Sequence, residues 1–245
     1  MKNYKLTLSY DGTKYNGWQR LASTDNTIQQ KVETVLSRLL DQPVEVSASG
    51  RTDAGVHARA QVCSFRVEAE LGCEELLAAL RQYLPKDIGA LSLEEASPRF
   101  HARLNCRAKT YLYRIWTSEQ PNVFERNYVY PLPVILDISA MRKAAGYLQG
   151  EHDFSAFTNA KKMKKSPVRR IDEILLDEKE EELQIYYTGN GFLYNMARIL
   201  TGTLLEIGEG IRSPEEIPEI LAAGKRENAG FLAPAGGLIL WEVRY

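Results

Sequence analysis

The sequence predicts an α+β fold of two similar units, each a sheet with helices packed on one face, around a central cleft. Three observations support this fold class: alternating polar and apolar stretches typical of half-buried strands, apolar residues at helical spacing between them, and repetition of this order in the second half. The predicted units span residues 1–105 and 106–245. Because no Pro/Gly-rich linker separates them, we expect the units to pack closely and to leave a cleft where a ligand binds.

In the first half, predicted strands are twice followed by a helix. The opening strand alternates from Tyr4 to Tyr10 and ends at the turn signal Asp11-Gly12. A helix opens near Thr27, and a later one ends at Pro85. The predicted elements are, in order, a strand over 4–10, a helix over 28–40, strands over 44–47 and 60–67, and a helix over 76–84.

The second half repeats the pattern in outline. Its strands are predicted from alternation and its helices from apolar residues three and four positions apart. The predicted elements are a strand over 111–116, a helix over 138–148, a strand over 183–187, helices over 192–205 and 213–222, and a strand over 238–245.

Composition bounds the class of protein. The 245 residues carry a net charge of −1, and the three cysteines form no Cys-x-x-Cys pair, so neither a disulfide framework nor a zinc site is indicated. No apolar run reaches the length of a signal core or a membrane span. We therefore expect a soluble, unprocessed protein of the reducing cytoplasm.

Positive charge is concentrated although the net charge is small. Residues 161–170 hold six cations in ten positions, and residues 99–109 hold four with no acid, while acids cluster at 177–182 and 215–219. Such runs often form only a solvated face, but this separation of signs also permits a basic groove that binds nucleic acid.

The segment Ser-Gly-Arg-Thr-Asp-Ala-Gly-Val-His-Ala, residues 49–58, is the strongest candidate for chemistry. Asp53 stands between Gly50 and Gly55, which permit a sharp turn and close approach of a ligand to the backbone. A single carboxylate suits the role of nucleophile or base rather than paired acid and base. A bare Thr-Asp-Ala-Gly is also compatible with an ordinary turn, and a metal pair of Asp53 and His57 lacks a third ligand.

Arg198 is a candidate partner for that carboxylate. An ionised aspartate in a partly dry pocket needs a nearby positive charge to keep its pKa low. Arg198 lies in an apolar helical stretch beside Ile199 and Leu200, which indicates a position near the core. The alternative is an arginine whose charged end reaches solvent along the helix.

Several segments in one order resemble the TruA family of bacterial tRNA pseudouridine synthases. The matching segments are Gly-Arg-Thr-Asp-Ala-Gly-Val-His-Ala at 50–58, Arg-Ala-Lys-Thr-Tyr-Leu-Tyr-Arg at 107–114, Gly-Phe-Leu-Tyr-Asn-Met-Ala-Arg-Ile-Leu-Thr-Gly at 191–202, and shorter ones at 10–13, 17–20, 27–30, 152–157, 166–169 and 233–238. Together they cover much of the chain and are far more specific than any one alone. Ala197 stands where the family pattern leads us to expect valine.

The resemblance implies the pseudouridine synthase fold and isomerisation of uridine to pseudouridine at positions 38 to 40 of the tRNA anticodon arm. It implies that Asp53 is the catalytic nucleophile or base, that Arg198 pairs with it, and that Tyr111 stacks on the target base. Arg51 is the candidate to replace the flipped base in its stack. The resemblance also implies a homodimer with tRNA as partner and no metal or cofactor.

The basic run is the predicted contact for the RNA backbone. Its candidate RNA-binding residues are Lys161, Lys162, Lys164, Lys165 and Arg169. The sequence is also compatible with two alternatives to a tRNA enzyme. These are a related pseudouridine synthase acting on another RNA, such as ribosomal RNA, and a non-catalytic RNA-binding module.

Overall fold

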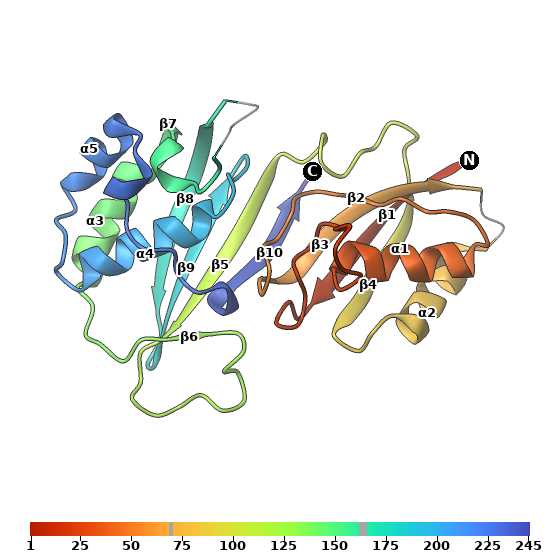
Figure 1. Ribbon diagram of the computed structural model, residues 1–245, viewed down its shortest axis with the longest axis horizontal. Helices are drawn as coiled ribbons and strands as arrows, with labels where there is room; N and C mark the ends of the chain where they lie inside the picture. The colour runs from red at the N-terminus through yellow and green to blue at the C-terminus, as the bar shows by residue number, and fades with distance from the viewer. Residues whose placement is uncertain (69–70, 162–165) are drawn as a thin grey trace. The chain divides into compact units, whose positions relative to one another are not determined.

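A computed structural model describes residues 1–68, 71–161 and 166–245. The chain divides into two compact units, Met1–Arg107 with Ile239–Tyr245, and Ala108–Leu238 (Figure 1). Each unit combines a sheet with helices, so the α+β class is confirmed. The predicted boundary lies at 105, whereas the structure groups residues up to Arg107 together with Ile239–Tyr245. In this unit Ile239 and Leu240 pair with His57 and Ala58.

In the residues described, the first unit is built on four main strands. Its elements are β1 (Lys2–Tyr10), α1 (Ile28–Leu39), β2 (Ser47–Ala48), β3 (His57–Val67), α2 (Cys73–Tyr83), β4 (Ile88–Ala96) and β10 (Leu238–Arg244). The order is β4-β1-β3-β10, with the short β2 beside β3. β1 is antiparallel to β3 and β4, whereas β10 runs parallel to β3 with Ile239 opposite His57.

The helices of this unit form as their sequences predict. Thr27 caps α1 by accepting a hydrogen bond from the Gln30 amide, and α1 buries Ile28, Val32 and Leu36 at helical spacing. α2 contacts both α1 and β4. Alternate residues of β1, Tyr4, Leu6 and Leu8 among them, are almost fully buried, so the core of the unit lies along this strand.

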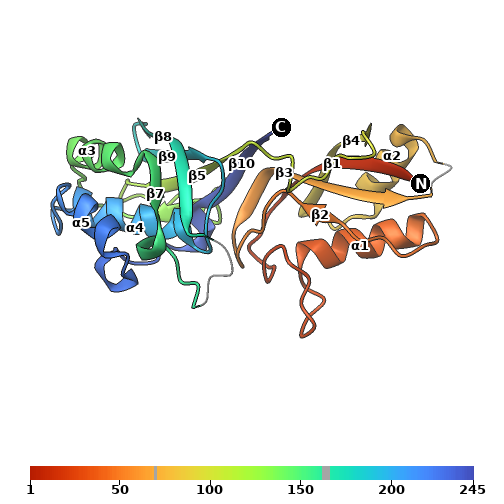
Figure 2. The same ribbon diagram turned by 90° about the horizontal axis from the view of Figure 1, so that it is seen from above.

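The second unit has an antiparallel sheet with helices beside it (Figures 1 and 2). Its elements are β5 (Ala108–Trp116), β6 (Tyr130–Pro131), α3 (Ile138–Leu148), β7 (Gly150–Asp153), β8 (Val168–Glu178), β9 (Glu182–Gly189), α4 (Met196–Gly208) and α5 (Glu216–Ala223). The order is β5-β9-β8-β7, and β6 adds a short parallel pairing to β5. α3 contacts α4, α5 and β8, and α4 is buried along nearly its whole length.

Three differences from the predicted elements have physical reasons. β8 was missed because it is rich in charge, and only one of its faces is buried. β4 was also missed, as its sequence ends in exposed acids. The helix predicted from Phe192 begins only at Met196, because Asn195 adopts a left-handed conformation with φ 63° and breaks the helical path before it.

Candidate active site

The loop that carries Asp53 joins β2 to β3 and is held by buried hydrogen bonds. The Tyr10 hydroxyl lies 2.8 Å from Thr52 Oγ1. Gln61 on β3 accepts from Ser49 Oγ at 2.7 Å and donates to the Gly50 carbonyl at 2.9 Å. Burial raises the pKa of Tyr10, so at neutral pH this group remains an uncharged hydroxyl. The residues on both sides of Arg51 are therefore fixed to the sheet.

The segment after β1 packs directly on the same loop. Gly17 has φ +87°, and a Cβ there would lie 2.8 Å from the Thr52 carbonyl oxygen. The Trp18 amide donates to that same oxygen at 3.0 Å. At Gly12 an added Cβ would lie only 2.0 Å from the Val56 carbonyl oxygen. Glycine is thus required on this side of the loop by close approach as well as by conformation.

Asp53 is half-buried at the turn, whereas Arg51 is exposed. The Asp53 carbonyl accepts from the Val56 amide at 3.1 Å, and Gly55 adopts φ +78°. The main-chain turn is closed by the backbone itself. Residues 53–56 therefore form a turn, as expected for Thr-Asp-Ala-Gly. The residues before this turn are hydrogen-bonded to β1 and β3.

His57 follows the turn and is buried. Its Nδ1 accepts from the Gly12 amide at 3.0 Å and lies 3.2 Å from Asp11 Oδ1. Asp11 Oδ1 also accepts from the Thr13 amide and hydroxyl. His57 thus joins the Asp53 turn to the segment after β1, and in the described residues no group of three His, Cys, Asp or Glu side chains is arranged to hold a metal ion.

In the second unit, Tyr111 lies on β5 opposite Tyr187 of β9. Its ring meets Phe192 edge to face, with centroids 5.0 Å apart and planes at 80°. Tyr111 is 7% exposed. The neighbouring Thr110 hydroxyl lies 2.9 Å from that of Thr188. The Tyr111 ring is therefore buried and packs against Phe192.

Arg198 lies in the first turn of α4 and is half-buried. Its Nε donates to the Ala233 carbonyl at 2.7 Å, and the Ala233 amide donates to the Arg198 carbonyl at 3.3 Å. The next residue, Pro234, accepts from the Tyr113 hydroxyl at 2.8 Å. The guanidinium is thus oriented by the 233–234 segment and is not extended freely into solvent.

The basic run is described only in part. Lys161 is exposed, and Arg169 donates from Nη1 to the carbonyls of Ser166 and Val168 at 2.9 and 2.6 Å. Burial lowers the pKa of Arg169, yet arginine remains charged at neutral pH. Lys162, Lys164 and Lys165 lie outside the described residues.

Comparison with known proteins decides the family. A family model described as "tRNA pseudouridine synthase" matches residues 7–105 and 144–245. "tRNA pseudouridine synthase A 2" of Bacillus cereus (strain ZK / E33L) is 46% identical over 245 residues, which is all of both chains. The chain belongs to the tRNA pseudouridine synthase family.

Two further members of the family show the same full-length similarity. "tRNA pseudouridine synthase A 2" of Clostridium perfringens is 43% identical and "tRNA pseudouridine synthase A" of Bacillus sp. (strain KSM-64) is 45% identical, each over the whole of both chains. The resemblance inferred from the sequence motifs is confirmed, as is the assignment of the chain to an isomerase family that converts uridine to pseudouridine.

Sequence reasoning missed the residues that support this family's aspartate loop in the present chain. Tyr10 ends a predicted strand and begins a matching segment, but neither pattern indicates its hydrogen bond with Thr52. Gln61 carries no signal, because a lone glutamine in a strand is compatible with many roles. Gly17 and Ala233 lie in segments that matched the family, but the sequence did not reveal their contacts with Thr52 and Arg198.

No helix in the described parts of the chain has both the length and the apolar content that a membrane span requires.

Proposed function

We propose that this protein isomerises uridine to pseudouridine in tRNA, at positions 38 to 40 of the anticodon stem-loop, with Asp53 as the catalytic nucleophile or base. The observation that carries the proposal is the aspartate turn itself. Its preceding residues are tied to β1 and β3 by Tyr10 and Gln61, within a chain related over its full length to tRNA pseudouridine synthases.

The reaction balances without an oxidant or reductant. The bond between uracil N1 and ribose C1′ breaks, a bond between C5 and C1′ forms, and in net the C5 proton is lost while N1 gains one. Asp53 acts either by attack on the substrate or by removal of a proton, and a fixed, ionised carboxylate is suited to both. The rigid turn supports this role because positioning lowers the barrier of either step.

We assign roles in the reaction to three other side chains, one toward Asp53 and two toward the RNA. Arg198 stabilises the ionised form of Asp53 in this proposal, since its guanidinium is already oriented by Ala233. Tyr111 supplies the aromatic face for the target base. Arg51 is exposed beside the turn, which suits a side chain that fills the space of a flipped nucleotide.

The basic run is assigned to the RNA backbone. Lys161, Lys162, Lys164, Lys165 and Arg169 supply the positive charge for phosphate contacts. We further propose that the protein is a cytoplasmic homodimer, which is the assembly implied by the resemblance to the family.

The proposal is tested with unmodified tRNA whose uridines carry tritium at C5. The protein is expected to release tritium, and sequencing of the product is expected to place pseudouridine at positions 38 to 40. Release from tRNA with pseudouridine elsewhere would reject the position. Release only from ribosomal RNA would reject tRNA as the substrate.

A further inference from the structure

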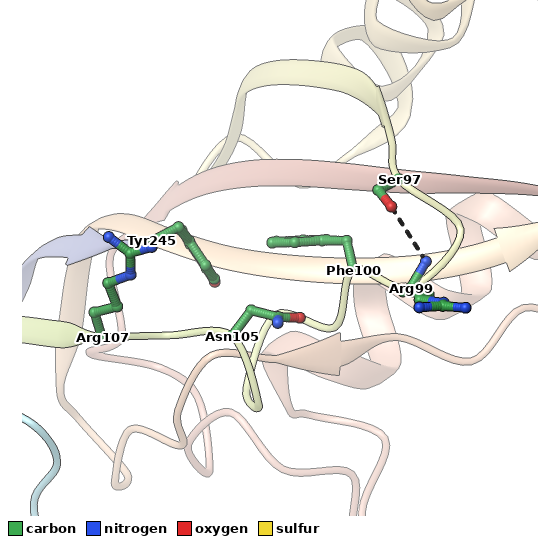
Figure 3. Close-up of a pocket in the computed structure, with 6 residues that line it drawn as sticks. All are labelled: Ser97, Arg99, Phe100, Asn105, Arg107 and Tyr245. Atoms are coloured by element: carbon green, nitrogen blue, oxygen red, sulfur yellow. Dashed lines mark hydrogen bonds between the residues drawn. The ribbon is translucent and has the colours of Figure 1, made fainter.

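A pocket in the first unit lies outside the aspartate loop. It has a volume of about 310 Å³ and is lined by Ser97, Arg99, Phe100, Asn105, Arg107 and Tyr245. Figure 3 shows Arg99 and Arg107 on opposite sides of the Phe100 and Tyr245 rings. The two ring centroids are 5.0 Å apart. We call this site the Arg99–Arg107 pocket.

Partly buried side-chain hydrogen bonds and a main-chain hydrogen bond hold the walls of the pocket. Asn3 of β1 donates from Nδ2 to the carbonyls of Ser97 and Phe100 at 2.7 and 2.9 Å. The Tyr245 hydroxyl donates to the Ala102 carbonyl at 2.8 Å, and the Arg107 amide donates to the Arg244 carbonyl at 2.9 Å. The backbone that carries the two arginines is therefore organised before any ligand binds.

The charge of the pocket is not neutralised by the protein. Among the described residues, the guanidinium groups of Arg99 and Arg107 have no hydrogen-bond or ion-pair partner. Both side chains are exposed and so are accessible to a ligand. The acids nearby are paired with other cations, Glu94 with Lys5 and Glu242 with Arg244. Two unpaired guanidinium groups beside a fixed aromatic pair form a site for anionic oxygens such as phosphates.

The distance between the pocket and the aspartate loop indicates how long a ligand must be to reach both. The Ala102 amide donates to Ser64 Oγ at 3.1 Å, so the pocket lies beside Ser64 on β3. Asp53 comes just before His57, which begins that strand, and the seven residues from His57 to Ser64 span roughly 23 Å. A ligand that occupies both places is a polymer and not a single nucleotide.

We propose that the Arg99–Arg107 pocket binds backbone phosphates of the RNA substrate at a distance from the nucleotide that reacts. This inference rests on the proposed function, because it takes tRNA as the polymer. Arg99 and Arg107 contact separate phosphates, and Asn105 and Ser97 offer hydrogen bonds to phosphate or ribose oxygens. The Phe100–Tyr245 pair gives the two arginines a rigid support.

The test compares binding of unmodified tRNA over a range of KCl concentrations. The double variant Arg99→Ala with Arg107→Ala is expected to bind more weakly, and its plot of log affinity against log salt is expected to be shallower by about 1.4 to 1.8. The charge-preserving variant Arg99→Lys with Arg107→Lys is expected to retain most of the wild-type slope.

A matched control removes two positive charges elsewhere in the same unit. Arg38→Ala with Lys86→Ala changes exposed side chains on and after the helices, and its salt slope is expected to equal that of the wild type. An unchanged slope in the Arg99/Arg107 variant, or an equal loss in the control, would overturn the pocket assignment. Modification of the tRNA is measured in the same samples. If the wild type binds tRNA without modifying it, the proposed function is rejected, but the salt dependence of binding still tests the pocket.

Discussion

Arg198 and Ala233 are joined by two hydrogen bonds, one from the Arg198 Nε to the Ala233 carbonyl and one from the Ala233 amide to the Arg198 carbonyl. Ala233 precedes Pro234, whose carbonyl accepts from the Tyr113 hydroxyl. The segment before β10 is thus bound to both α4 and β5, and it holds the Arg198 guanidinium in one orientation. This orientation suits a residue that acts on a partner charge.

Replacement of Arg198 by lysine tests this role. Arg198→Lys removes both the Nε donor and the planar fork that suits a carboxylate. We expect kcat to fall about ten- to a hundredfold, as for a misplaced catalytic group, with only a small fall in Tm. Tritium release and thermal unfolding are measured together. Arg212→Lys is the control, because Arg212 pairs with Glu206 and Glu216 in the same unit, and turnover in Arg198→Lys equal to that control would show Arg198 to be structural.

Tyr10→Phe tests whether the aspartate turn must be rigid. The change deletes one hydroxyl and leaves Thr52 Oγ1 buried without this partner. We expect a loss of unfolding free energy of about 1–3 kcal/mol and a fall in kcat that persists at temperatures where the variant is fully folded. Urea unfolding and tritium release measure the two effects.

The matched control for Tyr10 is Tyr187. Its hydroxyl is also buried, 2.8 Å from Thr201 Oγ1, but lies in the second unit. Tyr187→Phe should lose similar stability with little change in kcat. If both variants lose activity in proportion to stability, the Tyr10–Thr52 hydrogen bond has no special part in catalysis.

Gly17→Ala tests the close approach of the segment after β1 to the loop. Two effects are combined at Gly17, a positive φ and a Cβ only 2.8 Å from the Thr52 carbonyl. Gly210 separates them, because it has φ +73° with no atom within 4 Å of an added Cβ. We expect Gly210→Ala to lose about 1–2 kcal/mol from conformation alone, and Gly17→Ala to lose more and to slow catalysis. Equal losses in unfolding free energy would show that the loop yields to the added methyl group.

Much of the fold followed from local patterns, while the support of the site did not. The alternation in β1 and the start of α1 near Thr27 are encoded within a few residues, so both were predicted correctly. The start of α4 depends on one backbone angle at Asn195, and β8 depends on pairing with β9, neither of which periodicity reports. The contacts of Gln61 with Gly50 and of Arg198 with Ala233 join residues 11 and 35 positions apart, and only the folded structure reveals them.

The basic run predicts a second dependence on salt. Lys161→Ala with Lys162→Ala removes two charges from the run, so tRNA affinity should fall and the salt slope should become shallower by about 1.4 to 1.8 if both contact phosphates. The unfolding free energy should change little, as Lys161 is exposed. Equal affinity of the variant and the wild type at every salt concentration would remove these lysines from the RNA contact.

We propose that Asp53 performs the chemistry, and replacing its carboxylate by an amide is the decisive experiment. Asp53→Asn keeps the size of the side chain and removes its charge and basicity, while Asp41→Asn makes the same change at an exposed position whose positive φ asparagine tolerates. With C5-tritiated tRNA, we predict release by the wild type and by Asp41→Asn, and no release above background by Asp53→Asn, although it still binds tRNA. Undiminished release by Asp53→Asn would contradict the assignment.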